Sequence, residues 1–437
     1  IYVDDSGNIY VTGESESSDW GVAPVNAHNG DAQDDIFVAK LDGSGTLIWH
    51  TFLGSSYRDL GDGITLDGAG NIYVSGRSEA TWGTAPKRAY TGGTDVFVAK
   101  LNSSGARQWN TFMGSVSYDS GSEIAVDGSG FVYVAGFSDA AWGAPLNVHA
   151  GNADILVAQL NSNGDLQWHT FLGSSDADRC YGLDLDASDN LYITGNSFAN
   201  WGTPIVPYTG NNIFAAKLNS SGGVLWNTFM GSSANNNSGH HIFATGSGEV
   251  FVTGRSEGTW GEPIYPYVGG SETLLTKLNT DGQYQWHTFM GSGAYDEGNG
   301  IVLDASGHAY LAGLSDATWG APIRAFAGGK DVSIAKVRLP LNTIWEYDVG
   351  DTNVYRLVFP DINADGYDEL LLYDDSKQVR VISGADVADE LWSYTLPTNG
   401  RRGIQLLDDL DDDGIMDILV IAGTSDRLNN YGDDAMW

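Results

Sequence analysis

The sequence has little cysteine, little positive charge and no long apolar run. Cys180 is the only cysteine in 437 residues, which excludes an intrachain disulfide framework and any zinc or iron–sulfur site made of cysteines alone. Only 21 basic residues oppose 56 acidic ones, giving a net charge of −35. A surface with this much negative charge repels phosphates and anionic lipids. We therefore expect no nucleic-acid partner and no peripheral membrane binding. No apolar run reaches the roughly 18 residues of a membrane span, so we expect no membrane insertion.

Proline is also scarce, whereas glycine is abundant. There are 11 prolines and 58 glycines, and 42% of the residues are hydrophobic, which indicates many tight turns rather than disorder. The chain begins Ile1-Tyr2-Val3, inside an expected strand and without a methionine. We therefore expect a processed or incomplete N-terminus.

A repeat of about 60 residues organises the first four-fifths of the chain. A tryptophan followed by His or Asn, Thr and Phe recurs at intervals of 60, 59, 58 and 60 residues, and a sixth tryptophan follows 59 residues later. These tryptophans are Trp49, Trp109, Trp168, Trp226, Trp286 and Trp345. A second tryptophan keeps the same interval inside Trp-Gly-x-Pro or Trp-Gly-x-x-Pro. Six units therefore occupy about 348 residues.

Each unit predicts four short strands. In residues 63–115, alternating or β-branched runs at 64–67, 72–75, 96–101 and 108–112 are separated by glycine-rich turns and one long polar loop. No window of 11 residues carries a helical apolar stripe. Four-stranded units repeated at least six times predict an all-β fold, a β-propeller.

Two stretches of the repeat resemble a known bacterial repeat. Residues 95–105 read DVFVAKLNSSG and are followed by Trp109-Asn110-Thr111-Phe112, and residues 124–130 (IAVDGSG) run into 132–136 (VYVAG). These stretches resemble the bacterial seven-bladed β-propeller repeat, the SBBP repeat. The resemblance implies a module of bacterial extracellular proteins.

The composition changes after Trp345. Residues 346–437 contain 21 acidic and 6 basic residues. Two segments, 361–369 and 409–417, fit the pattern D-x-[DN]-x-D-G-x-x-[DE]. Carboxylates at alternate positions of a tight loop, with glycine at the sixth, suit a calcium ion that takes six to eight oxygen ligands. An EF-hand would need Glu at position 12, where Leu372 and Val420 stand.

The two acidic loops resemble the calcium loops of FG-GAP repeats. We expect two calcium sites, with an acidic surface turn as the alternative for each. Five like charges in 408–413 would repel one another without a cation or solvent. The expected ligands are Asp361, Asn363, Asp365, Tyr367 and Glu369 in the first loop, and Asp409, Asp411, Asp413, Ile415 and Asp417 in the second.

The loops also suggest how the chain is divided. Turns that begin at Asp67, Asp127, Asp186 or Asp304 join the first and second strands of their units, and the acidic loops occupy the same place. We expect six blades in residues 1–348, and a seventh blade and a partial eighth of the same propeller in 349–437. A closed eight-bladed propeller is the alternative. Missing residues or another chain would supply the absent strands, because two strands alone are marginal.

Two sets of tryptophans need separate explanations. The fourth-strand set resembles the tryptophan-docking motif of quinoprotein propellers, which implies that it joins adjacent blades. The alternative, a quinone-dependent enzyme, is disfavoured because every blade carries the same residues. The loop set either covers its own blade or forms a ligand or partner face, for glycans or for self-association. Its members are Trp20, Trp82, Trp142, Trp201, Trp260 and Trp319.

The other reactive residue types suggest no catalytic centre. His50, His169 and His287 alternate with Asn at one repeat position, and strand alternation predicts a solvent-facing edge for them. The pair His240-His241 lacks a third metal ligand in sequence, and we expect Cys180 to be a small buried residue. No nucleophile elbow, phosphate loop or metalloprotease helix motif is present.

These observations favour a non-enzymatic, secreted or surface-attached protein of a bacterial type. We expect a structural, adhesive or self-assembling role, with this chain itself or other surface proteins as partners and calcium as a stabilising ion. The alternative is a carbohydrate-binding or carbohydrate-active propeller that uses the Trp-Gly-x-Pro loops.

Overall fold

Short antiparallel strands joined by glycine-containing turns make up almost all of the described chain. The computed structural model describes residues 1–17, 23–29, 33–210, 212–232, 236–304, 307–320, 322 and 326–337. Beyond these it describes the backbone of seven further strands. Contacts divide the chain into two units, Ile1–Arg338 and Leu339–Trp437. The described residues contain no helix long and apolar enough to cross a bilayer.

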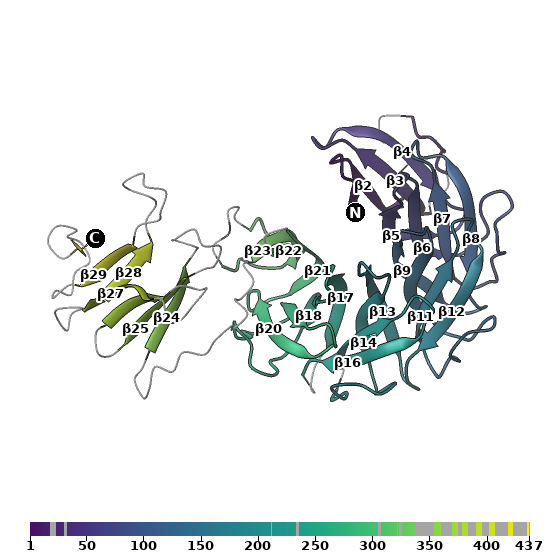
Figure 1. The fold of residues 1–437 in the computed structure, drawn as a ribbon. Coiled ribbons are helices and arrows are strands. Elements are labelled where there is room, and N and C mark those ends of the chain that lie inside the picture. Colours follow the sequence, from purple (N-terminus) through teal and green to yellow (C-terminus); the bar gives the residue numbers. More distant parts are fainter. Residues whose placement is uncertain are drawn as a thin grey trace. The chain divides into compact units, whose positions relative to one another are not determined.

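The first unit contains six antiparallel sheets, and strands follow one another in chain order across each (Figure 1). The first sheet comprises β1 (Tyr2–Val3), β2 (Ile9–Ser15), β3 (Asp35–Leu41) and β4 (Leu47–Leu53). The second comprises β5 (Asp59–Leu66), β6 (Ile72–Ser78), β7 (Asp95–Leu101) and β8 (Arg107–Met113). The third sheet comprises β9 (Asp119–Val126), β10 (Val132–Ser138), β11 (Asp154–Leu160) and β12 (Leu166–Leu172). The fourth comprises β13 (Asp178–Leu185), β14 (Leu191–Ser197), β15 (Asn212–Leu218) and β16 (Val224–Met230). The fifth sheet comprises β17 (Asn237–Ala244), β18 (Val250–Ser256), β19 (Glu272–Leu278) and β20 (Tyr284–Met290). The sixth comprises β21 (Asp296–Leu303), β22 (Ala309–Ser315) and β23 (Asp331–Val337).

The second unit contains two more sheets. One comprises β24 (Val354–Phe359), β25 (Glu369–Asp374), β26 (Gln378–Ile382) and β27 (Glu390–Thr395). The other comprises β28 (Arg402–Leu406), β29 (Ile418–Ala422) and β30 (Ala435–Met436). The expected four strands of residues 349–395 are therefore present, and the last sheet has a short third strand where only two strands were predicted.

The predicted all-β architecture of four-stranded propeller blades is confirmed for the first unit. The first strands of successive blades, from β5 through β9, β13 and β17 to β21, pack against one another, so they form the inner side of the array (Figure 1). The described structure shows six blades, of which the sixth has three described strands; its expected fourth strand, near Trp345, lies outside the described residues. Seven complete blades with a partial eighth in one propeller remains a prediction.

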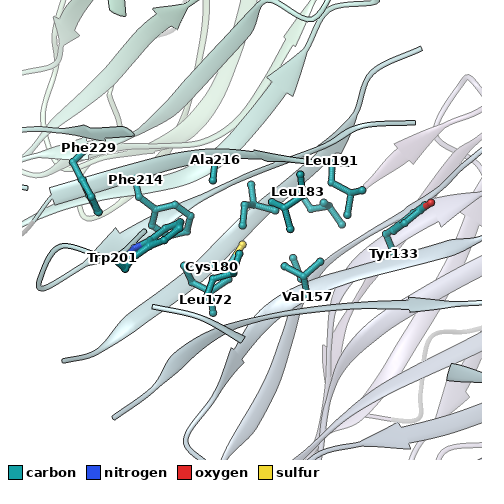
Figure 2. Packing of buried hydrophobic residues seen from close by; sticks show 14 residues of the cluster. Tyr133, Val157, Leu172, Cys180, Leu183, Leu191, Trp201, Phe214, Ala216 and Phe229 are labelled. Carbon is teal, nitrogen blue, oxygen red and sulfur yellow. The ribbon is translucent and has the colours of Figure 1, made fainter. Parts of the chain in front are cut away.

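Apolar side chains fill the space between adjacent blades. One cluster joins the third and fourth blades and includes Val157, Cys180 and Phe214, each 0% exposed (Figure 2). Cys180 pairs with Gly195, and glycines occupy the equivalent place in the neighbouring inner strands. The prediction of a small buried residue at Cys180 is confirmed, and burial raises the pKa of its thiol.

The fourth-strand tryptophans dock onto the next blade, as the resemblance to the docking motif implied. Trp109 on β8 packs against Gly164 in the β11–β12 hairpin, and its indole Nε1 donates a hydrogen bond to the carbonyl of Ser162 at 3.2 Å. Trp226 makes the same bond to the carbonyl of Thr280 two junctions further along. Both tryptophans are half-buried.

Replacing the docking glycine is expected to destabilise the junction. Gly164 has a φ of +84°, and a Cβ there would lie 2.8 Å from a ring carbon of Trp109. Gly164→Ala should therefore cost about 1–3 kcal/mol of unfolding free energy. Gly68→Ala is the control, since a Cβ at Gly68 meets nothing within 4 Å. Equal melting temperatures for the two variants would contradict this docking geometry.

The turn between the first and second strands is built around an aspartate. The carboxylate of Asp67 accepts hydrogen bonds from the backbone N–H groups of Ala69 and Asn71 and from the Tyr73 hydroxyl. Burial opposes ionisation of Asp67, but these hydrogen bonds outweigh it and lower the pKa. The predicted turn positions at Asp67, Asp127, Asp186 and Asp304 are confirmed, whereas the two acidic loops lie outside the described residues.

Candidate functional site

Most of the loop tryptophans that the structure describes have buried side chains. Trp82, Trp142 and Trp201 are only 5%, 7% and 6% exposed, whereas Trp260 and Trp319 are half-buried. Trp142 meets Phe171 edge to face at 6.0 Å between ring centres. Trp20 lies outside the described residues. Burial of three of these rings favours packing over a stacking surface for sugars.

The prediction that the repeated histidines face solvent is wrong. His50, His169 and His287 are 0%, 2% and 0% exposed. The loop folds back over the fourth strand, so the indole of Trp142 stacks on the imidazole of His169 at 3.8 Å. His169 Nε2 also lies 2.9 Å from the Trp142 carbonyl, and the Asn blades make the same contact, since Asn110 donates to Trp82 at 3.0 Å.

The residues after each loop tryptophan cover the free edge of the fourth strand. We call these five-residue segments, each beginning at the proline, the straps: 24–28, 86–90, 145–149, 204–208 and 263–267. In the third blade the N–H of Leu146 donates to the carbonyl of His169 at 2.9 Å, and the N–H of Phe171 donates to Asn147 at 3.3 Å. The same two bonds recur in the second, fourth and fifth blades. Each strap thus occupies hydrogen-bonding groups that an edge strand would otherwise expose.

The inner strands are where the blades differ chemically. Their fourth residues are Asp62, Ser122, Tyr181, His240 and Asn299, and their fifth residues are Gly63, Glu123, Gly182, His241 and Gly300. The absent Cβ atoms matter here, because a Cβ at Gly63 would lie 3.0 Å from the Cα of Glu123. Large polar residues therefore alternate with glycine along this side of the array. The repeat pattern of the sequence did not predict these differences between blades.

Several carboxylates on the inner strands have raised pKa values. Burial raises the pKa of Glu123 to about 7 and the pKa values of Asp62 and Asp184 to about 6. Asp184 also accepts a hydrogen bond from the Ala244 N–H of the next blade at 2.8 Å, so it links two inner strands. Asp62 lies 3.5 Å from Arg77. These groups could exchange protons near neutral pH, but no hydrogen-bonded nucleophile and base accompany them among the described contacts.

The histidine pair also lies on an inner strand. His240 Nδ1 is 2.9 Å from the amide oxygen of Asn299 in the next blade. Burial lowers the pKa of His241 to about 4, which favours its neutral form. Within the described part of the chain, no three His, Cys, Asp or Glu side chains are placed to hold a metal ion.

Pairs of buried acids occupy the junctions between blades. Asp95 begins β7 and Asp119 begins β9 of the next blade, and both are 0% exposed. Their oxygens lie 2.7 and 2.8 Å from the point that a Cβ on Gly114 would take, so they face each other across the glycine Cα. The equivalent pairs are Asp35 with Asp59, Asp154 with Asp178, and Glu272 with Asp296.

The fourth junction carries Asn212 and Asn237 in place of two acids, both at most 2% exposed. Both positions change together, and the amides carry no charge. Burial raises the pKa of Asp95 to about 6, and Asp119 adds to the shift. One oxygen of Asp95 has no hydrogen-bond partner among the described residues. A neutral carboxyl group therefore suits this environment better than a second carboxylate.

Asp95→Asn is expected to stabilise the protein at alkaline pH. An acid whose folded pKa lies near 6 contributes most below 3.8, and this contribution is lost as the pH rises through 6. The wild type should thus be weakened by about 2 kcal/mol at pH 8 relative to pH 4 by this group alone, and the variant should not. Urea unfolding at pH 4 and pH 8 measures the difference. A variant with the same pH dependence as the wild type would refute the shifted pKa.

The expected calcium ligands cannot be assembled from the described part of the chain. Asp361, Asn363, Asp365 and Tyr367 lie outside the described residues, and Glu369 is described only as backbone at the start of β25. Asp409, Asp411, Asp413, Ile415 and Asp417 also lie outside. The calcium sites remain predictions.

A repeat signal could have identified the junction acids, although not their pairing. The first residues of the third strand and of the next inner strand are acidic in four junctions, in phase with the repeat. Strand periodicity assigns each residue to a face of its own blade, but it does not show which side chains meet across a junction. Asp62, Glu123 and Asp184 carry no repeat signal, because an acid stands at each of these strand positions in one described blade alone.

No known protein family matches the chain, and no curated protein does. Several solved structures are similar over much of its length. A gluconolactonase from Xanthomonas campestris is 12% identical, covering 64% of this chain and 79% of its own, with a TM-score of 0.35. The Neurospora crassa Pan2 WD40 domain is 8% identical, covering 78% and 81%, with a TM-score of 0.36. A Synechocystis apocarotenoid oxygenase is 10% identical, covering 88% and 90%, with a TM-score of 0.37.

Proposed function

We propose that this chain is a non-enzymatic β-propeller of the SBBP type that acts outside the cell as a structural, adhesive or self-assembling protein. The observation that carries the proposal is the use of the repeated motifs in packing. The tryptophans, the His or Asn residues and the straps close each blade upon itself or onto its neighbour. What recurs in every blade therefore serves the scaffold, and the surface is left for partners.

Charge and the acidic loops support an extracellular setting. A net charge of −35 keeps copies apart and soluble unless cations screen it. Calcium is abundant outside cells and suits both acidic loops. In this proposal, two calcium ions hold the turns that follow β24 and β28, and the second unit supplies the seventh blade and part of an eighth.

Calcium removal tests the proposal directly. We expect calcium to raise the melting temperature of the wild type, and a chelator to reverse the effect. A variant carrying Asp365→Asn and Asp413→Asn should no longer respond to calcium. Light scattering and negative-stain electron microscopy, with calcium and with chelator, should reveal assemblies in the wild type. A monodisperse monomer under both conditions would overturn the self-assembling role.

A further inference from the structure

Acidic residues are absent from the outer rim of the first unit. We define the rim as the strands β4, β8, β12, β16 and β20 together with the five straps that cover them. These segments contain no Asp or Glu, although the chain has 56. The only Lys or Arg residues in them are Lys87, Arg88 and Arg107, all in the second blade.

The rim of the third to fifth blades is apolar as well as free of carboxylates. Val148 is 79% exposed, Tyr265 is 65% exposed and Leu146 is 54% exposed. Ile205, Val206 and Ile264 are each at least 40% exposed. Isolated exposed apolar residues are ordinary, but a series of them on equivalent straps of consecutive blades marks an interaction surface.

The straps are connected into one surface by contacts with the next blade. The terminal methyl of Leu146 lies against Gly222 in the hairpin of the fourth blade, beside the ring of Trp168. Ile205 reaches Gly282 of the fifth blade in the same way, beside Trp226. The backbone of each strap is held by two hydrogen bonds, so the exposed side chains are presented on a fixed frame.

We infer that this rim is the surface through which two copies of the chain associate, an inference that rests on the self-assembling role proposed above. The distribution of charge favours a second copy of the chain at the rim. Any contact through the remaining surface would bring carboxylates of two chains, each of net charge −35, against one another. Contact of rim with rim buries apolar side chains and keeps the acidic surfaces apart.

Introduced acids test the inference. A variant with Val148→Glu and Tyr265→Glu places charge on the two most exposed large apolar residues of the rim and leaves Leu146 and Ile205 unchanged. Val116→Glu is the matched control, because Val116 is 74% exposed on the loop between β8 and β9, outside the rim. Sedimentation velocity over a range of concentrations gives the dimer dissociation constant. We expect at least a tenfold weakening in the rim variant, none in the control, and unchanged melting temperatures.

The outcomes separate the rim from the wider proposal. If the wild type associates and the rim variant associates equally well, the rim is wrong and the self-assembling role stands. If the wild type is monomeric at all concentrations, with and without calcium, both fail. Hydrogen exchange of residues 145–149 and 263–267 gives a further check. Protection that rises with concentration supports a second copy, whereas protection that is the same at every concentration, as the hydrogen bonds of the straps give by themselves, overturns the inference.

Discussion

Trp142→Ala is expected to remove about 3–5 kcal/mol of unfolding free energy, which is the cost of deleting a buried aromatic side chain. The indole is 7% exposed, stacks on His169 at 3.8 Å and meets Phe171 edge to face. Its loss leaves a cavity between the strap and β12. It also removes the stacking partner of a buried imidazole. Thermal and urea unfolding measure the effect.

The same variant separates packing from glycan binding. Val148→Ala is the control, because Val148 lies on the same strap but is 79% exposed. Retention on a panel of immobilised glycans should not distinguish Trp142→Ala from the wild type at a temperature where both are folded. Loss of retention with an unchanged melting temperature would contradict the packing role and revive the carbohydrate-binding alternative.

His287→Asn is expected to make the protein less sensitive to mild acid. His287 is 0% exposed and stacks on Trp260 at 3.6 Å, and its Nδ1 lies 2.7 Å from the Tyr284 hydroxyl oxygen. Burial lowers the pKa of His287 from 6.5 to about 4. The folded protein therefore holds a neutral imidazole at pH values where the unfolded chain binds a proton.

The sign of the effect follows from that difference. The contribution of His287 to stability is complete above pH 6.5 and is lost as the pH falls toward 4. Between pH 7 and pH 5 the wild type should lose about 2 kcal/mol from this group, and the variant should lose none of it. Acids such as Asp95 act in the opposite direction over the same range, so the difference between variant and wild type is the quantity to measure.

The chain supplies its own precedent for this test. Asn110 and Asn227 stand at the equivalent position and donate to the carbonyls of Trp82 and Trp201. The asparagine introduced by His287→Asn should make the same bond to the carbonyl of Trp260. The reverse substitution, Asn227→His, should add acid sensitivity to the fourth blade. Parallel stability curves for the wild type and both variants between pH 7 and pH 5 would refute a depressed histidine pKa.

Local pattern predicted much of the fold, because the strands, turns and docking tryptophans are set by short-range chemistry. The predicted strand at 96–101 lies within β7, and the turn at Asp67 lies between β5 and β6. The glycine that receives Trp109 is also part of the repeat. The same local signals recur in six units of the sequence, and this regular recurrence of four-stranded units indicated a propeller.

The misplaced histidines show where local pattern fails. The alternation of side chains along a strand placed His169 on the uncovered face of an outermost strand, where solvent exposure is expected. The strap that covers this face comes from between the second and third strands of the same blade, and sequence periodicity does not reveal where such a loop packs. Proximity across blades is hidden for the same reason, which is why the pairing of Asp95 with Asp119 emerged only in three dimensions.

The straps also bear on how such an array grows. Each described strap from the first to the fifth blade belongs to the blade that it covers, because it lies between that blade's own second and third strands. A tandem duplication of about 60 residues would therefore add a blade together with the cover for its outer edge. The junction glycine, tryptophan and acid or amide pair would be copied with it. The length of the array can then change over evolutionary time without exposing a strand edge that invites aggregation.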